Sequence, residues 1–137
     1  MSRTVELTRV YHFSAAHCLS SPRLSPGDNA ALYGQCARPH GHNYYLEVTV
    51  AGVPDAQTGM AVDLDVVDRT VARSILDHVD HQRLEDVPAL SGVVTTGEGL
   101  ARAFWETLAA ALPDVALRRV VVQETAKNRF EYAGGAA

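Results

Sequence analysis

The sequence has few cysteines and no long hydrophobic run, and each shortage excludes a class of protein. Two cysteines among 137 residues can form at most one disulfide, too few for a secreted domain built on disulfides. No apolar stretch is long enough to cross a bilayer, and the first residues lack the apolar core of a signal peptide. We therefore expect a soluble, cytoplasmic protein with reduced thiols and no membrane partner.

Positive charge is also scarce. The formal net charge is −4, and the basic residues are scattered along the chain rather than clustered. Proteins that neutralise nucleic-acid phosphates usually carry a basic stripe, so we do not expect nucleic acid as a partner. What the chain does contain is 47% hydrophobic residues without an internal repeat. This composition favours one globular domain, residues 1–137, around a single core.

The hydrophobic residues follow two periods that together predict an α+β fold. Alternation predicts strands at residues 5–13, 44–50 and 117–125, a short strand at 60–64, and a terminal hairpin that ends with 130–132. A repeat of about four residues predicts a helix at 65–81 and a second amphipathic helix that carries Leu100 to Leu112 and ends at Pro113. Thr95 and Glu98 fit a capping box at the start of the second helix. Residues 19–35 are rich in turn-forming residues and are expected to form a long loop.

Histidines are placed where they can chelate a metal. His40 and His42 are two residues apart, so on a strand they point to the same side, and Gly41 between them adds no obstruction. A third imidazole from a paired strand, with His17 as the candidate, would give three nitrogen ligands and an open fourth position, as in catalytic zinc sites. The thiol of Cys36 stands four residues before His40. The set therefore predicts a zinc enzyme with a thiol beside the metal.

Other interpretations of these residues remain open at this point. His40 and His42 might be surface histidines, and Cys36 might be a core thiol or a fourth zinc ligand that closes a structural site. Cys18 follows His17 and should face the other way on an extended backbone, so it is expected to be a small core residue.

Seven short motifs then identify a family. The chain resembles the 6-pyruvoyltetrahydropterin and 6-carboxytetrahydropterin synthases over residues 13–132. The motifs, in the family's order, are Phe13-Ser-Ala-Ala-His17, Tyr33-Gly-Gln-Cys36, His40-Gly-His-Asn-Tyr44, Gly59-Met-Ala-Val-Asp63, Asp80-His-Gln-Arg-Leu84, Thr95-Thr-Gly-Glu98 and Gln123-Glu-Thr125. The resemblance implies the tunnelling fold, a four-stranded antiparallel sheet with two helices packed on one face. It also implies a trimeric barrel, two stacked trimers forming a homohexamer, and active sites at subunit interfaces.

The resemblance further implies a role for each matching residue. His17, His40 and His42 would bind Zn²⁺, and Cys36 would be the catalytic base. Asp80 and His81 would complete its proton relay, although Asp77 and His78 have the same spacing and offer a second pair. Leu84, three residues after His81, favours the first pair because the family pattern has leucine there.

The pterin ring has its own expected contacts. Glu124 would accept N–H bonds from the ring, unless it merely pairs with Arg118 or Arg129. Thr96 could bring a backbone N–H to the ring, and Glu98 could touch it, although Glu98 is better explained as a helix cap. Gly97 departs from the family, which usually has Ser or Thr there.

Two activities fit these residues. Both start from 7,8-dihydroneopterin triphosphate, a small-molecule substrate. One eliminates triphosphate to leave a pyruvoyl side chain; the other also releases acetaldehyde to leave 6-carboxy-5,6,7,8-tetrahydropterin, for queuosine and other 7-deazaguanines. The short step from Cys36 to His40 resembles the carboxy type, which we therefore expect, whereas the long segment from His17 to Cys36 resembles the pyruvoyl type. A third interpretation is a zinc- or pterin-binding protein of the same fold without turnover.

Overall fold

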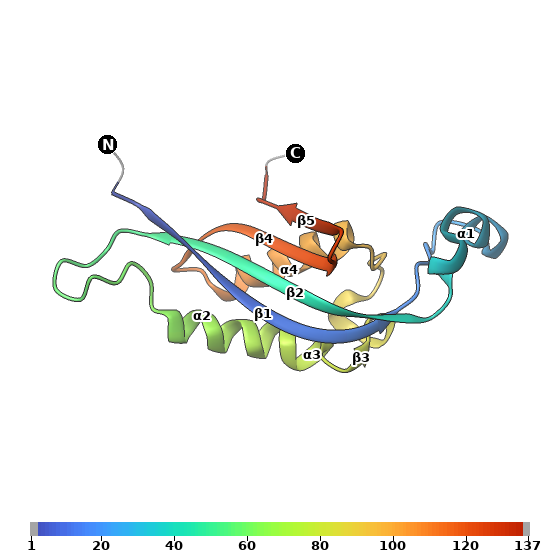
Figure 1. The fold of residues 1–137 in the computed structure, drawn as a ribbon, viewed down its shortest axis with the longest axis horizontal. Helices are drawn as coiled ribbons and strands as arrows, with labels where there is room; N and C mark the ends of the chain where they lie inside the picture. Colours follow the sequence, from blue (N-terminus) through green and yellow to red (C-terminus); the bar gives the residue numbers. More distant parts are fainter. Residues whose placement is uncertain (1–2, 136–137) are drawn as a thin grey trace.

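A five-stranded sheet in the order β3-β1-β2-β4-β5 organises the computed structural model, which describes residues 3–135 (Figure 1). The pairs β1–β2, β2–β4 and β4–β5 are antiparallel, and β3 runs parallel to β1. The strands are β1 Val5–His17, β2 His40–Gly52, β3 Gln82–Arg83, β4 Ala116–Thr125 and β5 Asn128–Tyr132. The α-helices are α1 Pro26–Tyr33, α2 Leu64–Val71, α3 Asp77–Val79 and α4 Gly97–Ala111. A π-turn at Ala72–Leu76 joins α2 to α3, and 3-10 turns lie at Gly34–Ala37, Leu84–Asp86 and Pro88–Leu90.

Strands β1 and β2 form a long ribbon that carries the rest of the fold. Their register runs from Val5 opposite Gly52 to His17 opposite His40. Because side chains alternate between the two faces of a strand, Phe13, His17 and Tyr44 all point to the same face. The rings of Phe13 and Tyr44 stack at 4.8 Å between centroids, and neither side chain is exposed. We call this face of the sheet the inner face.

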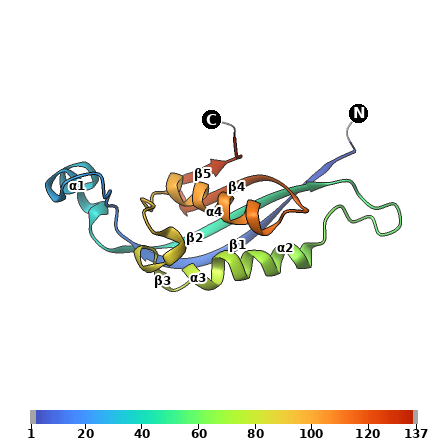
Figure 2. The same ribbon diagram turned by 180° about the vertical axis from the view of Figure 1, so that it is seen from behind.

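Helices cover only the inner face. Figure 2 shows α2 and α4 in front of the sheet when it is viewed from behind. The core lies between these layers and contains Val67, Val71, Ile75, Leu100, Phe104 and Leu108 of the helical layer with Leu46, Val48, Val120 and Val122 of the sheet. The opposite, outer face has no covering layer among the described residues. Val10 and Tyr45 on that face are 61% and 44% exposed.

The predicted long loop at residues 19–35 is wrong in part, because it contains α1. Ser25 caps this helix by accepting a hydrogen bond from the amide of Asp28, and Pro26 occupies its first turn. Serine and proline that indicate a turn are therefore also the residues that start a helix. Helix α1 projects beyond the end of the sheet (Figure 1). Its Asn29 side chain binds the backbone of Ser21 at both N–H and C=O.

Two other local predictions need correction. No strand forms at residues 60–64, because this segment leads into α2. Asp63 caps that helix and accepts hydrogen bonds from the amides of Asp65 and Val66 at 3.0 and 3.3 Å. Helix α4 also starts one residue later than the capping box implied. Its N-cap is Thr96, whose hydroxyl accepts from the amide of Gly99 at 3.1 Å.

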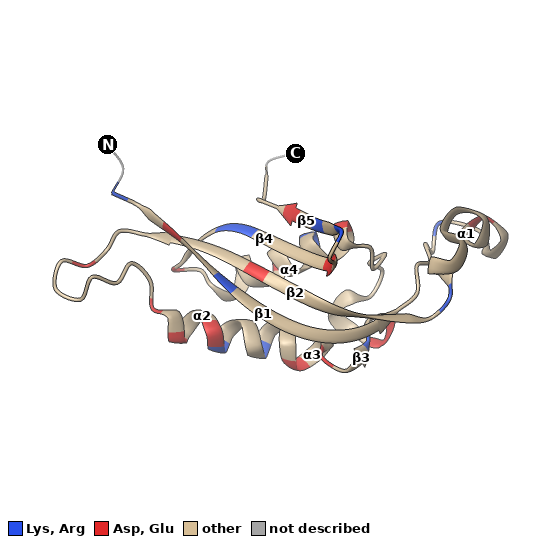
Figure 3. Ribbon diagram, viewed as in Figure 1, with Lys and Arg blue, Asp and Glu red and all other residues tan. Residues whose placement is uncertain are grey.

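The sheet has one strand more than expected. Strand β3 pairs with Ala15 and Ala16 of β1 and makes the sheet mixed rather than purely antiparallel. It is only two residues long, too short to show a hydrophobic period in the sequence. Acidic and basic residues are interspersed over the elements in Figure 3. None of the helices within residues 3–135 has the length and apolarity needed to cross a membrane.

Candidate metal and catalytic site

Three histidines meet on the inner face where β1 ends and β2 begins. His17 is the last residue of β1, His40 is its partner at the start of β2, and His42 follows two residues later. One ligand atom from each ring lies within 4.8 Å of the others. The ring centroids are 4.5 to 5.0 Å apart. The strand pairing thus brings together residues 17, 40 and 42 as expected from their spacing.

Backbone carbonyls hold two of the rings. The Nδ1 atom of His17 lies 2.9 Å from the carbonyl oxygen of Thr95, and that of His40 lies 2.7 Å from the carbonyl oxygen of Arg38. A carbonyl oxygen can only accept, so Nδ1 carries the hydrogen in both rings and Nε2 keeps its lone pair. Metal-binding histidines are commonly oriented in this way.

Burial favours the neutral form that binds a metal. His17 has no exposed surface, and burial lowers its pKa below the usual 6.5. Burial likewise lowers the pKa of His42. Within residues 3–135 the Nε2 atom of His42 is buried and makes no hydrogen bond, although Oε1 of Glu124 lies 3.3 Å away. A buried polar atom in this state is costly unless it binds an ion, and three imidazole nitrogens at this spacing fit zinc.

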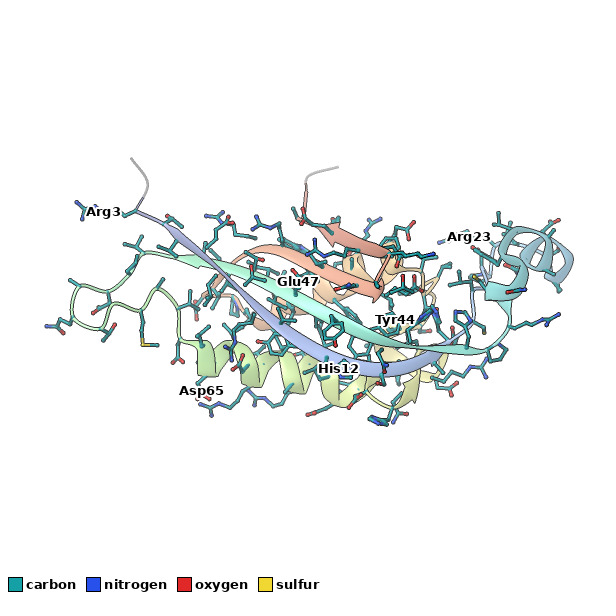
Figure 4. The ribbon with its side chains drawn as sticks, in the orientation of Figure 1. Arg3, His12, Arg23, Tyr44, Glu47 and Asp65 are labelled. Atoms are coloured by element: carbon teal, nitrogen blue, oxygen red, sulfur yellow. The ribbon has the colours of Figure 1, made fainter. Side chains whose placement is uncertain are left out.

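Glu124 of β4 reaches the same cluster. Its Oε1 atom lies 3.4 Å from Nε2 of His17 and 3.3 Å from Nε2 of His42, and its side chain is 15% exposed. The competing partners are engaged elsewhere: Arg129 binds Glu47 at 2.7 Å, and Arg118 lies 4.0 Å from Glu6. Glu124 is therefore part of the histidine site rather than of a surface ion pair. Tyr44, labelled in Figure 4, lies beneath the cluster with its hydroxyl 3.3 Å from Nε2 of His17.

Cys36 is exposed, in the 3-10 turn that precedes β2. It is therefore not an inert core thiol, and within residues 3–135 the group of potential metal ligands contains the three histidines without it. The amide of Leu19 donates to the carbonyl of Cys36 at 2.7 Å, which ties this turn to the chain just after His17. Cys18 is only half-buried, contrary to the expected core position, with Sγ 3.5 Å from Nη2 of Arg83.

Asp80 and His81 lie together at the end of α3. Their side chains meet at 3.0 Å between Oδ1 and Nδ1, and Asp80 also accepts from the amide of Ser14 at 2.9 Å. The hydrogen bond from the Ser14 amide lowers the pKa of Asp80 below its usual value. In residues 3–135, no ion pair is found for the alternative pair, Asp77 and His78. The geometry thus favours Asp80 and His81 as a unit.

This pair belongs to the outer face of the ribbon. His81, whose side chain is 81% exposed, lines a hollow that also includes His42, together with Ser14 and Asn43. By alternation these two side chains point away from the face that carries His17 and His42. No hydrogen bond or ion pair within the described chain joins the side chain of Cys36 to Asp80 or His81. Within residues 3–135 of one copy, the predicted relay pair and Cys36 are therefore not in direct contact.

The two residues expected near the pterin ring, Thr96 and Glu98, lie at the start of α4. Thr96 uses its hydroxyl for the helix cap, and Glu98 is exposed and lines a hollow with Phe130 and Tyr132 that contains none of the three histidines. Gly97 is explained by packing: a Cβ atom there would lie 1.9 Å from the ring of Phe130.

Glu85 and Thr95 were missed by the sequence analysis. Thr95 is buried and holds His17, while Glu85 binds Thr95. The only available signal was their position within or beside two of the matched motifs.

Comparisons with known proteins agree with this geometry. The family model described as 6-pyruvoyl tetrahydropterin synthase matches residues 6–135. A 6-pyruvoyl tetrahydrobiopterin synthase of Dictyostelium discoideum is 42% identical, with 98% of this chain and 99% of that protein covered. A 6-carboxy-5,6,7,8-tetrahydropterin synthase of Aquifex aeolicus is 27% identical, with 93% and 96% covered. The solved structure of Caenorhabditis elegans 6-pyruvoyl tetrahydropterin synthase superposes with a TM-score of 0.90 at 37% identity and covers 96% of each chain.

Proposed function

Because the chain belongs to the 6-pyruvoyl tetrahydropterin synthase family, whose members are lyases, we propose that it eliminates triphosphate from 7,8-dihydroneopterin triphosphate and leaves a pyruvoyl side chain. The relatives support this product. The pyruvoyl-type protein of Dictyostelium is 42% identical over nearly the whole chain, against 27% for the carboxy-type protein of Aquifex. This outweighs the short step from Cys36 to His40, which had favoured the carboxy product and its queuosine pathway.

His17, His40 and His42 are the proposed zinc ligands. Their support is the cluster of ligand atoms within 4.8 Å, with two rings held through Nδ1 by carbonyl oxygens. When bound, zinc would grip hydroxyl groups of the substrate side chain and acidify the adjacent C–H bond. Burial lowers the pKa of His17 and of His42, which favours the neutral form that a metal needs.

Cys36 is the proposed base that takes this proton. Its support is position: the thiol is exposed, stands four residues before His40, and is absent from the group of potential ligands. A base must be within hydrogen-bond reach of the proton that it abstracts, and a thiol that ligates the metal in the resting state could not do this. Glu124 is the proposed pterin anchor, since its carboxylate lies beside the histidines and can accept two N–H bonds.

The proton relay is proposed to come from a second copy of the chain. Asp80 orients His81 through Nδ1, and His81 projects into solvent on the outer face rather than toward the histidines of its own chain. The outer face also exposes Val10 and Tyr45, a composition suited to burial between copies. A trimeric barrel, with two trimers stacked into a hexamer, would cover this face and bring His81 of one copy to Cys36 of another.

Product analysis tests this function most directly. Purified protein is incubated with 7,8-dihydroneopterin triphosphate and zinc, and the products are separated by mass spectrometry. The proposal expects the pyruvoyl product and free triphosphate. The carboxy product with acetaldehyde would restore the original expectation, and unchanged substrate would favour a binding protein without turnover.

Cys36→Ala separates the base from a structural thiol. The variant is expected to keep its zinc and bind the substrate while turnover is lost. Loss of zinc along with activity would instead make Cys36 a metal ligand. Native mass spectrometry of the same preparation gives the oligomeric state. A monomer would contradict the proposal that two copies of the chain share one active site.

A further inference from the structure

Glu85 connects two separate segments that support His17. It lies in the 3-10 turn Leu84–Asp86, beside Leu84, whose side chain is fully buried and anchors the turn. Its Oε1 atom accepts hydrogen bonds from the amide of Cys18 at 2.9 Å and from the hydroxyl of Thr95 at 3.0 Å. These donors come from positions 67 and 10 residues away in the sequence. One carboxylate oxygen thus joins the end of β1 to the segment before α4.

Both bonded residues act on the same imidazole. Cys18 follows His17 directly, so its amide belongs to the backbone from which the ring projects. Thr95 supplies the carbonyl oxygen that accepts from Nδ1 of His17 at 2.9 Å. The hydroxyl of Thr95, held by Glu85, fixes the residue whose carbonyl selects the tautomer of the ring. Glu85 is therefore one step behind the partner that orients His17.

We propose that Glu85 is a positioning residue for the metal site, which holds the Nε2 atom of His17 toward the bound ion by fixing Cys18 and Thr95 together. This inference rests on the proposed zinc function. Glu85 itself touches neither the ion nor the substrate in this assignment. Arg83 lies 3.6 Å from Oε2 of Glu85 and leaves Oε1 to its two donors. The side chain is 26% exposed, so the bond to Thr95 is partly buried while the bond to Cys18 lies at the surface.

The choice of substitution follows from the shared oxygen. Glu85→Gln keeps a carbonyl oxygen in the place of Oε1, so it can still accept both hydrogen bonds. Glu85→Ala removes the acceptor. Asp86→Asn is the matched control, because it neutralises an exposed carboxylate in the next position without removing the bonds to Cys18 and Thr95.

The test measures zinc affinity by competition with a chromophoric chelator, and the absorption spectrum of the Co²⁺-substituted protein. Loss of a partner behind a metal-binding histidine usually weakens metal binding about 10- to 100-fold. We expect Glu85→Ala to weaken zinc binding by roughly 10-fold and to alter the Co²⁺ spectrum. Glu85→Gln and Asp86→Asn should both stay close to the wild-type protein.

Thr95→Val tests the connection itself. This substitution removes the hydroxyl while the backbone carbonyl remains, so it cuts the link from Glu85 to His17 that runs through Thr95, while the bond from the amide of Cys18 remains. If Glu85 acts through Thr95, the variant that combines Glu85→Ala with Thr95→Val should have about the same zinc affinity as whichever single variant binds zinc more weakly. Fully additive losses would show that the two residues act independently and would overturn the proposed connection.

Two results would separate this inference from the proposed function. A wild-type protein that binds no zinc contradicts the zinc function itself. A wild-type protein that binds zinc, with unchanged affinity and Co²⁺ spectrum in Glu85→Ala, contradicts only the positioning role. A lower melting temperature without either change would assign Glu85 to general stability and would also overturn the inference.

Discussion

The two faces of the β1–β2 ribbon carry titratable side chains that differ in burial and in how they are held. On the inner face, His17 is fully buried, and Thr95 and Arg38 fix the rings of His17 and His40. On the outer face, Asp80 and His81 are paired, but the side chain of His81 is 81% exposed. The histidines of the inner face are oriented by groups of the same chain. On the outer face Asp80 orients His81, but within residues 3–135 the ring of His81 has no further hydrogen-bond partner.

Under the proposed function, the fold of one chain places the metal ligands, and the assembly of several chains places the proton relay. A metal site needs ligands held firmly before the ion arrives, and the paired strand ends of one chain provide that. A proton relay needs only a correctly oriented donor at the surface, since a neighbouring copy can supply the group that it serves. The ribbon therefore holds the histidine cluster on its inner face and the Asp80–His81 pair at its outer face, and in the proposed function the two meet only between copies.

The largest expected effect comes from removing an inner-face ligand. His42→Ala should strip zinc and reduce kcat/KM by more than about 100-fold. Removing the hydrogen-bond partner behind a metal ligand usually costs about 10- to 100-fold, and here the ligand itself is removed. Elemental analysis gives the zinc content, and product formation gives the rate. His78→Ala, which removes an exposed histidine of α3 outside the cluster, is the control. Full zinc occupancy in His42→Ala would exclude His42 as a ligand.

His81→Ala disturbs the outer face instead. Turnover should fall by about 10²- to 10⁴-fold, the usual contribution of general acid-base catalysis, while zinc content stays unchanged. His78→Ala, from the alternative pair, should have little effect. If His78→Ala is the variant that loses turnover, the relay assignment is wrong.

Co-expression sharpens this comparison further. Subunits with Cys36→Ala and subunits with His81→Ala are each expected to be inactive alone. Mixed assemblies should regain activity in about a quarter of their sites, where an intact thiol meets an intact relay from another copy. No recovery in mixed assemblies of proven composition would place both groups in the same chain.

The two faces also differ in how far the sequence predicted them. The spacing of His40, Gly41 and His42 predicted the metal cluster, because alternation on a strand is a local rule that survives folding. Strand pairing then brought His17 opposite His40, as expected for an antiparallel ribbon. The sequence also predicted well the helix at residues 65–81, the second helix that ends before Pro113, and the terminal hairpin, since each is long or sharply bounded.

Features that depend on distant segments were not predictable. Strand β3 exists because two residues after α3 pass beside Ala15 and Ala16, and no local pattern announces such a contact. Glu85 acquires its role only when β1 and the segment before α4 meet. Helix α1 was missed because Ser25 and Pro26 indicate a turn as readily as a helix start.

An intermediate effect is expected at Gly97, which stands close behind the inner site. The added Cβ of Gly97→Ala would overlap the ring of Phe130 and force the start of α4 away from β5. Overpacking of this kind usually costs about 1–3 kcal/mol of unfolding free energy. Urea denaturation measures it, and the cost should shrink in a Phe130→Val background. An equal cost in both backgrounds would assign the destabilisation to the backbone of α4 rather than to the ring.

The smallest effect should come from Asp68→Asn, which tests a carboxylate that supports packing without serving the metal. Arg9 donates to both oxygens of Asp68, at 3.1 and 2.6 Å, and the hydroxyl of Tyr11 donates at 2.6 Å, so α2 is held against β1. These bonds, from Arg9 foremost, lower the pKa of Asp68 below its usual 3.8.

The sign of the pH dependence follows from that shift. The unfolded chain takes up the proton first, so the stabilisation is fully present above pH 3.8 and is lost as the pH falls through the lower pKa of the folded state. Because Asp68 is 36% exposed, solvent screening limits the loss at neutral pH to about 1 kcal/mol or less. Denaturation at several pH values should show the difference between wild type and Asp68→Asn shrinking below about pH 3.8, with zinc affinity unchanged throughout. Weaker zinc binding in this variant would mean that the packing of α2 also holds the histidines, and the separation of structural from functional carboxylates along β1 would fail.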